Sequence, residues 1–272
     1  MRNHVAQRSV NAAVSPLELG QPFARDYPVV QETAATEMWR QIRLSTCFWV
    51  LIAFWSLWNA SPSFGQPWDK LRDRAEMEVL NGKAEIVSYR SHRAVHLIPS
   101  PDHQGPEDSV LAILSNSEFS DGVIEVEVAG SPRSGAPADS RGFIGISFHV
   151  QPHGSRSETI YLRPTNARAD DQLRRNHSVQ YSSEPDFPWY RLREQKPGVY
   201  ESYADLEPGA WTKMRIVVSG KEAQLYINGS PQPCLIVKDL KLGSSGGHIA
   251  LWAHSSTDGY FSRLRITSAK PR

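Results

Sequence analysis

Uncharged polar side chains alternate with apolar ones in residues 142–151, whose sequence is GFIGISFHVQ. The apolar positions run from Ile144 to Val150, and the positions that alternate with them include Ser147, His149 and Gln151. Because side chains alternate between the two faces of a strand, this pattern predicts one buried face and one polar face without Lys or Glu. Sugar hydroxyls need hydrogen-bonding partners of this uncharged kind. The polar face is therefore a candidate sugar-binding surface.

Aromatic and further hydrogen-bonding side chains occupy the corresponding face of predicted strands in residues 159–163, 178–181 and 248–254. Aromatic rings stack on the C–H faces of sugars, so the mixture fits a glycan. The predicted ligand-binding residues are Ser147, His149, Gln151, Tyr161, Arg163, Gln180, Trp189, Trp252 and His254. In the alternative interpretation, Trp189 and Tyr190 of a long connection fill the groove and the polar groups bond to one another.

Carboxylates give a less definite pattern. Glycoside hydrolysis normally uses two carboxyl groups on either side of the scissile bond. Glu125 and Glu127 belong to an alternating segment with a charged face, which is typical of a solvated strand surface. Glu201 and Asp186, on or beside predicted loops, are the remaining catalytic candidates. They form no recognisable pair, so the sequence leaves catalysis undecided.

Metal-binding patterns do not support a site. His149 and His153 are four residues apart, but on a strand and its following loop this spacing does not place two imidazoles on one side. Asp170 and Asp171 lack the alternating oxygen ligands of a calcium loop. We therefore predict no metal site and no cofactor, with a structural calcium ion as an open alternative.

Short β-rich segments separated by Gly, Pro, Ser and Asp fill the chain from Trp68 onward, and no helical periodicity competes with them. Asn228-Gly229 predicts a hairpin turn with positive φ at both residues. Residues 164–197 form the longest irregular stretch, with one predicted strand at 178–181. Alternation places Ile146, Phe148, Leu225 and Ile227 in the core. About a dozen strands without a long linker predict an all-β, two-sheet antiparallel sandwich.

The order of these segments resembles a known superfamily. The segments FSDGVIEVEV, GFIGISFHVQ, YLRP, VQY and the block from Trp211 to Trp252 resemble the concanavalin A-like lectin and glucanase jelly rolls, which include laminin G-like domains. The resemblance covers about residues 76–267 and is strongest to the 3-keto-disaccharide hydrolase-like branch of bacterial secreted proteins. It implies two curved sheets with sugar ligands on the concave one. Because the branch contains binding modules and hydrolases, the fold does not decide the activity.

Three functions follow from this comparison. We expect an exported carbohydrate-recognition domain that binds a glycan on the concave face of the jelly roll. The alternative is a glycoside hydrolase of the 3-keto-disaccharide hydrolase type. A second alternative, an adhesion or scaffold domain that binds protein, predicts an exposed apolar patch instead of a polar groove.

Charge and cysteine content restrict the partners. The 272 residues include 30 Lys and Arg against 29 Asp and Glu, which excludes an electrostatic basis for nucleic-acid binding. Membrane contact is expected only through an uncleaved signal anchor. Cys47 and Cys234 imply no disulfide framework, and Cys234 is expected to act as a small buried apolar residue.

The amino-terminal part has the composition of an export signal. Arg40 and Arg43 precede an apolar run, and small residues follow at Ser63 and Gly65. This predicts a signal peptide, or a retained membrane anchor, in residues 38–65 and a secreted or periplasmic product. Residues 1–37 are then a disordered leader or result from a misassigned start, and residues 66–272 form one jelly-roll domain.

Overall fold

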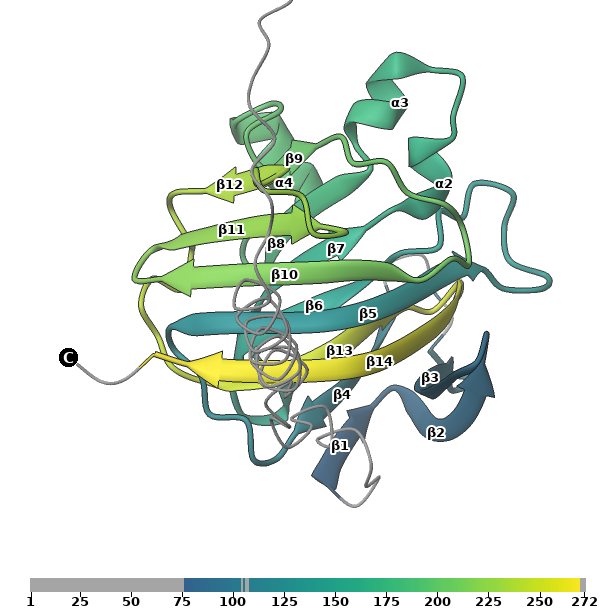
Figure 1. The fold of residues 1–272 in the computed structure, drawn as a ribbon, viewed down its shortest axis with the longest axis horizontal. Helices are drawn as coiled ribbons and strands as arrows, with labels where there is room; N and C mark the ends of the chain where they lie inside the picture. The colour runs from purple at the N-terminus through teal and green to yellow at the C-terminus, as the bar shows by residue number, and fades with distance from the viewer. Residues whose placement is uncertain (1–75, 104, 106–107, 270–272) are drawn as a thin grey trace, which may run out of the picture. The chain divides into compact units, whose positions relative to one another are not determined.

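Among the described residues, two antiparallel sheets of seven strands each stack against one another (Figure 1). This computed structural model describes residues 76–103, 105 and 108–269, so the predicted leader, export signal and cleavage site lie outside the described residues. Sheet A contains, in spatial order, β1 (Met77–Leu80), β4 (Ser109–Leu114), β13 (His248–His254), β6 (Ile144–Val150), β7 (Ser157–Leu162), β8 (Val179–Glu184) and β9 (Glu201–Ser202). Sheet B contains β12 (Leu235–Val237), β11 (Glu222–Ile227), β10 (Thr212–Ser219), β5 (Gly122–Pro132), β14 (Thr257–Ser268), β3 (His92–Pro99) and β2 (Gly82–Tyr89). The predicted all-β jelly-roll sandwich is confirmed.

The core lies between the sheets and contains the residues that strand alternation predicted. Ile146, Phe148 and Leu225 are fully buried, and Ile227 is 8% exposed. They belong to one continuous apolar cluster contributed by both sheets. The inward faces of β6 and β11 were therefore predicted correctly.

The outer face of sheet B is a charged surface whose ions pair across neighbouring strands. Glu125 on β5 pairs with Lys213 on β10 at 3.2 Å. Glu127 pairs with Arg263 on β14 at 2.9 Å and lies 3.2 Å from the His92 imidazole. This arrangement agrees with the solvated strand face that the sequence predicted.

The turn at Asn228-Gly229 has the predicted backbone geometry. Both residues have positive φ, at 50° and 77°, and the Ser230 amide donates to the Ile227 carbonyl. The chain then continues to residue 234 before β12 pairs with β11. The hairpin is real, but its connection is longer than the two-residue turn.

Residues 164–197 contain more regular structure than the sequence indicated. They include α2 (Pro164–Ala167), α3 (Gln172–Asn176) and α4 (Trp189–Gln195), and strand β8 extends to Glu184. A short 3-10 turn, η3 (Pro152–Gly154), joins β6 to β7. Helices of one or two turns are too short for a 3.6-residue periodicity to appear in the sequence. In Figure 1 the three α-helices gather at the end of sheet A formed by β7, β8 and β9.

Two further expectations concern membranes and cysteine. Among the described residues, no helix has the length and apolar character needed to cross a bilayer. Cys234 forms no disulfide in this part of the chain, and burial raises the pKa of its thiol to about 11. It packs against the core cluster, as expected for a small apolar residue.

Candidate functional site

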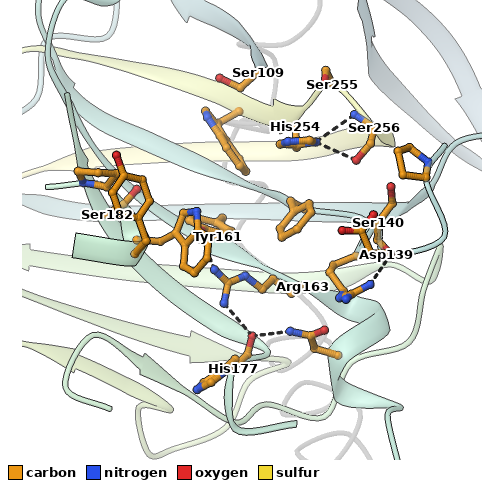
Figure 2. A pocket seen from close by; sticks show the side chains of 18 of the residues that line it. Ser109, Asp139, Ser140, Tyr161, Arg163, His177, Ser182, His254, Ser255 and Ser256 are labelled. Carbon is orange, nitrogen blue, oxygen red and sulfur yellow. Dashed lines mark hydrogen bonds between the residues drawn. The ribbon is translucent and has the colours of Figure 1, made fainter. Parts of the chain in front are cut away.

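A pocket of about 770 Å³ lies on the face of sheet A that points away from the core. It is built where β7 and β13 end and β6 begins, and the long connections surround it. Figure 2 shows Tyr161 and Arg163 near its centre, with Asp139, Ser140 and His254 to one side, Ser182 to the other and His177 below. We call this site the sheet A pocket.

The floor of the pocket holds two aromatic rings on β13 and β7, the strands on either side of β6. Gly145 on β6 is paired with Trp252 on β13 and with Tyr161 on β7, so all three share one face. The two ring centroids are 4.8 Å apart. A Cβ atom at Gly145 would lie only 2.2 Å from the Ile160 carbonyl oxygen and 2.6 Å from Tyr161. The glycine therefore permits the close approach that brings the two rings together.

Arg163 follows Tyr161 on the same face and is 4% exposed. Its Nη2 donates to the Tyr161 hydroxyl at 3.0 Å, and its Nη1 donates to the His177 carbonyl at 3.3 Å. The guanidinium lies 5.2 Å from the Tyr161 ring and 5.4 Å from the Trp189 ring. Its Nε is buried without a hydrogen-bond partner among the described residues. Arg163 is thus a buried cation held mainly by aromatic rings.

A charged cluster forms the wall beside it. Arg193 of α4 donates to both carboxylate oxygens of Glu201 on β9, with its Nη2 2.6 Å from Oε2. His177 lies 3.2 Å from the other oxygen of the same carboxylate. Burial lowers the pKa of His177, and the Arg193 and Arg163 charges act in the same direction against the opposing effect of Glu201. Glu201 therefore contacts two of the nitrogen-bearing side chains that line the pocket, the Arg193 guanidinium and the His177 imidazole.

His254 lies on the rim of the pocket at the end of β13. Its Nδ1 accepts a hydrogen bond from the Ser256 amide at 3.1 Å and lies 2.8 Å from the Ser256 hydroxyl. A nitrogen that accepts from an amide carries no proton, so neutral His254 holds its proton on Nε2. The ring also packs against Phe143, at a centroid distance of 5.0 Å.

The connection before β6 supplies a second rim. Asp139, Ser140 and Arg141 line the pocket there, and Arg174 of α3 lines it from the other side. Partial burial lowers the pKa of Arg141; the Arg174 and Arg163 charges reinforce this effect and Asp139 opposes it. The cationic groups are thus close enough to repel one another.

The structure brings five of the nine predicted ligand-binding residues into the pocket. These residues are Tyr161, Arg163, Trp189, Trp252 and His254. Trp189 lines the opening as a wall and does not fill it, and Tyr190 beside it is 54% exposed. The long connection therefore encloses the groove at this end without closing it.

Ser147, His149 and Gln151 do not line the pocket, and a β-bulge explains two of the three. His149 has φ of 52°, and the pairing of β6 with β13 shifts by one residue at this point. His149 is consequently fully buried beside the core residue Phe119, and its Nε2 donates to the Ser120 carbonyl, 2.8 Å away. Beyond the bulge, Gln151 donates to the His149 and Gly246 carbonyls. Because the bulge adds one residue, the side chains that follow it point to the opposite faces of the sheet from those that strict alternation predicts.

Ser147 and Gln180 keep the predicted face but are sealed by internal hydrogen bonds. The Ser147 hydroxyl lies 2.8 Å from that of Thr159, and both side chains are buried. Gln180 donates to the Tyr181 and Tyr200 carbonyls and is 1% exposed. The alternative of internal bonding therefore holds for these two residues, although Gln180 lies directly opposite Tyr161 of the pocket floor.

The two catalytic candidates do not form an acid pair. Glu201 is held by Arg193 and His177, whereas Asp186 is exposed and pairs with Arg156 at 2.7 Å. The carboxylates that do line the pocket are Asp139 and Glu184. Within the described part of the chain, no cluster of three or more His, Cys, Asp or Glu side chains could hold a metal ion.

Sequence reasoning missed the pocket residues that loops and short helices supply. These are chiefly Asp139, Arg141, Arg174, His177 and Arg193, and Glu184 was missed too because β8 extends beyond the predicted strand at 178–181. Loops have no periodicity that assigns a side chain to a face, so position alone could not identify them. The available signal was the concentration of Arg in the long connection.

Comparison with solved structures defines the fold class as a galectin-like sandwich. A Bacillus subtilis protein with a galectin-like fold matches with a TM-score of 0.50 and 13% identity, over 76% of this chain and 96% of that chain. The carbohydrate binding module CBM66 from Bacillus subtilis matches with a TM-score of 0.49 and 11% identity, over 71% and 96%. The exoplasmic/lumenal domain of VIP36, in a Ca2+/Man3GlcNAc-bound form, gives 0.49 and 11%, over 74% and 87%.

The sequence then identifies the family. Residues 56–267 match the 3-keto-alpha-glucoside-1,2-lyase-like domain, and the chain belongs to this family. A search of curated proteins found no match. The resemblance inferred from the strand segments is confirmed.

Proposed function

We propose that this protein recognises a carbohydrate in the sheet A pocket. The observation that carries the proposal is the pair of rings, Tyr161 and Trp252, on the pocket floor next to hydrogen-bonding groups. A sugar ring has apolar C–H faces and a polar edge, so it matches an aromatic platform with polar surroundings. The volume of about 770 Å³ lies within the usual range for small-molecule sites.

Family membership and the polar rim support the same proposal. The family description names a keto-glucoside, which is a sugar. Ser140, Ser182 and His254 line the pocket and offer hydroxyl and imidazole groups to sugar hydroxyls. Carbohydrate binding therefore accounts for both the apolar floor and the polar edge.

A glycan array probed with residues 66–272 tests the proposal directly. We expect one class of saccharide to bind, and titration calorimetry should then give one site per chain. The variant Trp252→Ala should weaken this binding while it keeps the unfolding midpoint of the parent. A saccharide that binds the parent and Trp252→Ala equally well would place the site elsewhere.

Elimination from a 3-keto glucoside is a second candidate, favoured by the family to which the chain belongs. In such a reaction a base removes the C2 proton, the C1–O bond breaks, and the departing oxygen takes up a proton. Negative charge develops on the C3 carbonyl oxygen, which the Arg163 guanidinium could stabilise. Among the described residues, Asp139 and Glu184 are the carboxylates that line the pocket, and either is a candidate base for the C2 proton.

Product mass separates this candidate from hydrolysis and from simple binding. Elimination releases a sugar product that is lighter by one water than the hydrolysis product. Incubation of a 3-keto glucoside with the protein, followed by mass spectrometry, therefore distinguishes the reactions. Binding without any product would leave carbohydrate recognition as the function.

We also propose that the protein acts outside the cytoplasm. The Arg-flanked apolar run that ends near Gly65 supports export. Amino-terminal sequencing of the protein from its native host should begin near Gln66. Recovery of an intact cytoplasmic chain that starts at Met1 would contradict export.

A further inference from the structure

Arg163 lacks the partner that a buried cation normally has. It is 4% exposed, and among the described residues no carboxylate lies within ion-pair distance of it. A guanidinium has five N–H donors, and the structure uses Nη1 and Nη2 once each. Its Nε is buried without an acceptor. Because burial of an unpaired charge is unfavourable, this group is suited to an anion that arrives with a ligand.

The charges around Arg163 point to the same kind of ligand. Five arginines and two acids line the sheet A pocket among the described residues. The arginines are Arg133, Arg141, Arg163, Arg174 and Arg193, and the acids are Asp139 and Glu184. Glu201, behind the wall, is already engaged by Arg193 and His177. The described lining of the pocket therefore carries an excess of positive charge, although the chain as a whole has a net charge close to zero.

We propose that the saccharide bound in the sheet A pocket carries an acidic substituent, a carboxylate or a sulfate, whose oxygens accept hydrogen bonds from Arg163. This inference rests on the proposed function, because it specifies which sugars the pocket takes. A guanidinium forms paired hydrogen bonds with such oxyanions, and these bonds are stronger than those between neutral groups.

Arg163 lies beside the aromatic floor, where it could contact an acid group on a sugar that binds there. Arg163 is bonded to the hydroxyl of Tyr161, and the Tyr161 ring is paired with Trp252. Tyr161 is itself only 4% exposed, so the more exposed Trp252 ring is the stacking surface, and a sugar on it would present an attached acid group beside the guanidinium. The rings of Phe143 and Trp189, at 5.7 and 5.4 Å, limit access of water and so strengthen the electrostatic attraction.

Calorimetry with matched saccharides tests the inference. The probes are a galacturonic acid trimer, its carboxyl-reduced neutral counterpart and a sulfated carrageenan disaccharide, which carries sulfate but no carboxylate. We expect at least one acidic probe to bind about tenfold or more tightly than the neutral trimer. That preference should shrink when NaCl is raised from about 0.05 to about 0.5 M, because salt screens the charges.

Variants show whether Arg163 is responsible. Arg163→Gln should reduce acidic binding by about tenfold or more, and it should reduce the ratio of acidic to neutral affinity by the same factor. Since substitution of a buried residue can affect folding, Arg141→Gln on the rim provides a second variant with a smaller loss in the same direction. Arg265→Gln, on the outer face of sheet B, removes the same charge away from the pocket and should change nothing. Thermal melting of every variant verifies folding.

The outcomes separate this inference from the proposed function. Preference for the uronate or for the sulfated probe supports it and identifies the acid group. Equal affinity for acidic and neutral trimers overturns it but leaves carbohydrate recognition intact, as does acidic binding that Arg163→Gln does not weaken. Equal affinities together with loss of keto-glucoside elimination in Arg163→Gln would assign this residue to the reaction instead. If no saccharide on the array binds, both proposals fail.

Discussion

Two guanidinium groups contact the same indole ring, and their surroundings differ. On the wall of the sheet A pocket, Arg193 lies 4.8 Å from the Trp189 ring and forms a bidentate ion pair with Glu201. On the floor, Arg163 lies 5.4 Å from that ring, and no carboxylate among the described residues pairs with it. The Arg193 charge on the wall is therefore paired within the protein, whereas the Arg163 charge on the floor has no carboxylate partner among the described residues.

The outer face of sheet B follows the pattern of the wall. Its carboxylates Glu125 and Glu127 each have basic partners on neighbouring strands. This face also has aromatic rings in contact, since the centroids of the stacked Tyr89 and Tyr260 rings are 3.8 Å apart. Aromatic and charged residues together therefore do not define a binding site. The useful difference is whether the protein itself supplies the counter-ion.

The largest expected effect concerns the paired wall. Glu201→Gln should reduce the free energy of unfolding by roughly 2 to 4 kcal/mol, because it leaves the Arg193 guanidinium without its counter-ion. Chemical denaturation gives this value directly.

Asp186→Asn is the matched control for that substitution. Its carboxylate pairs with Arg156, but both side chains are about half exposed, at 52% and 51%. Exposed pairs contribute about 0 to 1 kcal/mol, so its stability should hardly change. Equal effects of the two substitutions would mean that pairing on the wall is not structural.

The second prediction concerns how stability depends on pH, through Glu158, a buried carboxylate that has no ion-pair partner like that of Glu201 among the described residues. Glu158 accepts from the Leu242 amide, and burial raises its pKa from the usual 4.5 to about 7 despite the nearby Lys241 charge. The folded protein therefore holds this proton over a pH range in which the unfolded chain has lost it. Stability should fall as pH rises from 4.5 to 7, by on the order of 3 kcal/mol in total.

Denaturation of the parent and of Glu158→Gln across this pH range checks the sign. His149 and His177, whose pKa values burial lowers, act in the opposite direction in both proteins. The difference between the two curves therefore isolates Glu158. A parent that does not lose stability relative to Glu158→Gln as pH rises would show that its carboxylate is adequately paired.

The third prediction compares two tryptophans on different sheets. Trp252→Ala in the sheet A pocket should weaken saccharide binding by about 1 to 3 kcal/mol through lost stacking area. Trp211 lines a smaller hollow on sheet B with Glu127 and Lys213, and Trp211→Ala should leave binding unchanged. Calorimetry on both variants decides between the faces. A loss with Trp211→Ala alone would move the site to sheet B.

The sequence was informative where strands keep their regular alternation. Tyr161, Trp252 and His254 could be assigned to one face because nothing interrupts the period of two before them. At His149 the rule failed, since a bulge adds one residue to β6. No glycine marks that position, so the local sequence gave no warning.

Charge pairing was beyond prediction from the sequence for a different reason. Whether an arginine meets a carboxylate depends on how α4 and β9 lie against sheet A, not on spacing along the chain. Glu201 and Arg193 are eight residues apart in an irregular stretch, and their contact depends on the tertiary structure. The aromatic floor of the candidate site could therefore be predicted from the sequence, and its charged wall could not.

The smallest expected effect concerns His254 at the rim. Its Nδ1 is engaged by the Ser256 amide, so the neutral ring offers a proton only from Nε2. His254→Ala should therefore remove one hydrogen bond to a sugar hydroxyl and weaken binding by roughly 0.5 to 1.5 kcal/mol. His248→Ala is the control, because His248 lies at the opposite end of the same strand and does not line the pocket. Calorimetry with the best-bound glycan should show a loss for His254→Ala only. Equal losses for both variants would indicate a general disturbance of β13 and would remove His254 from the site.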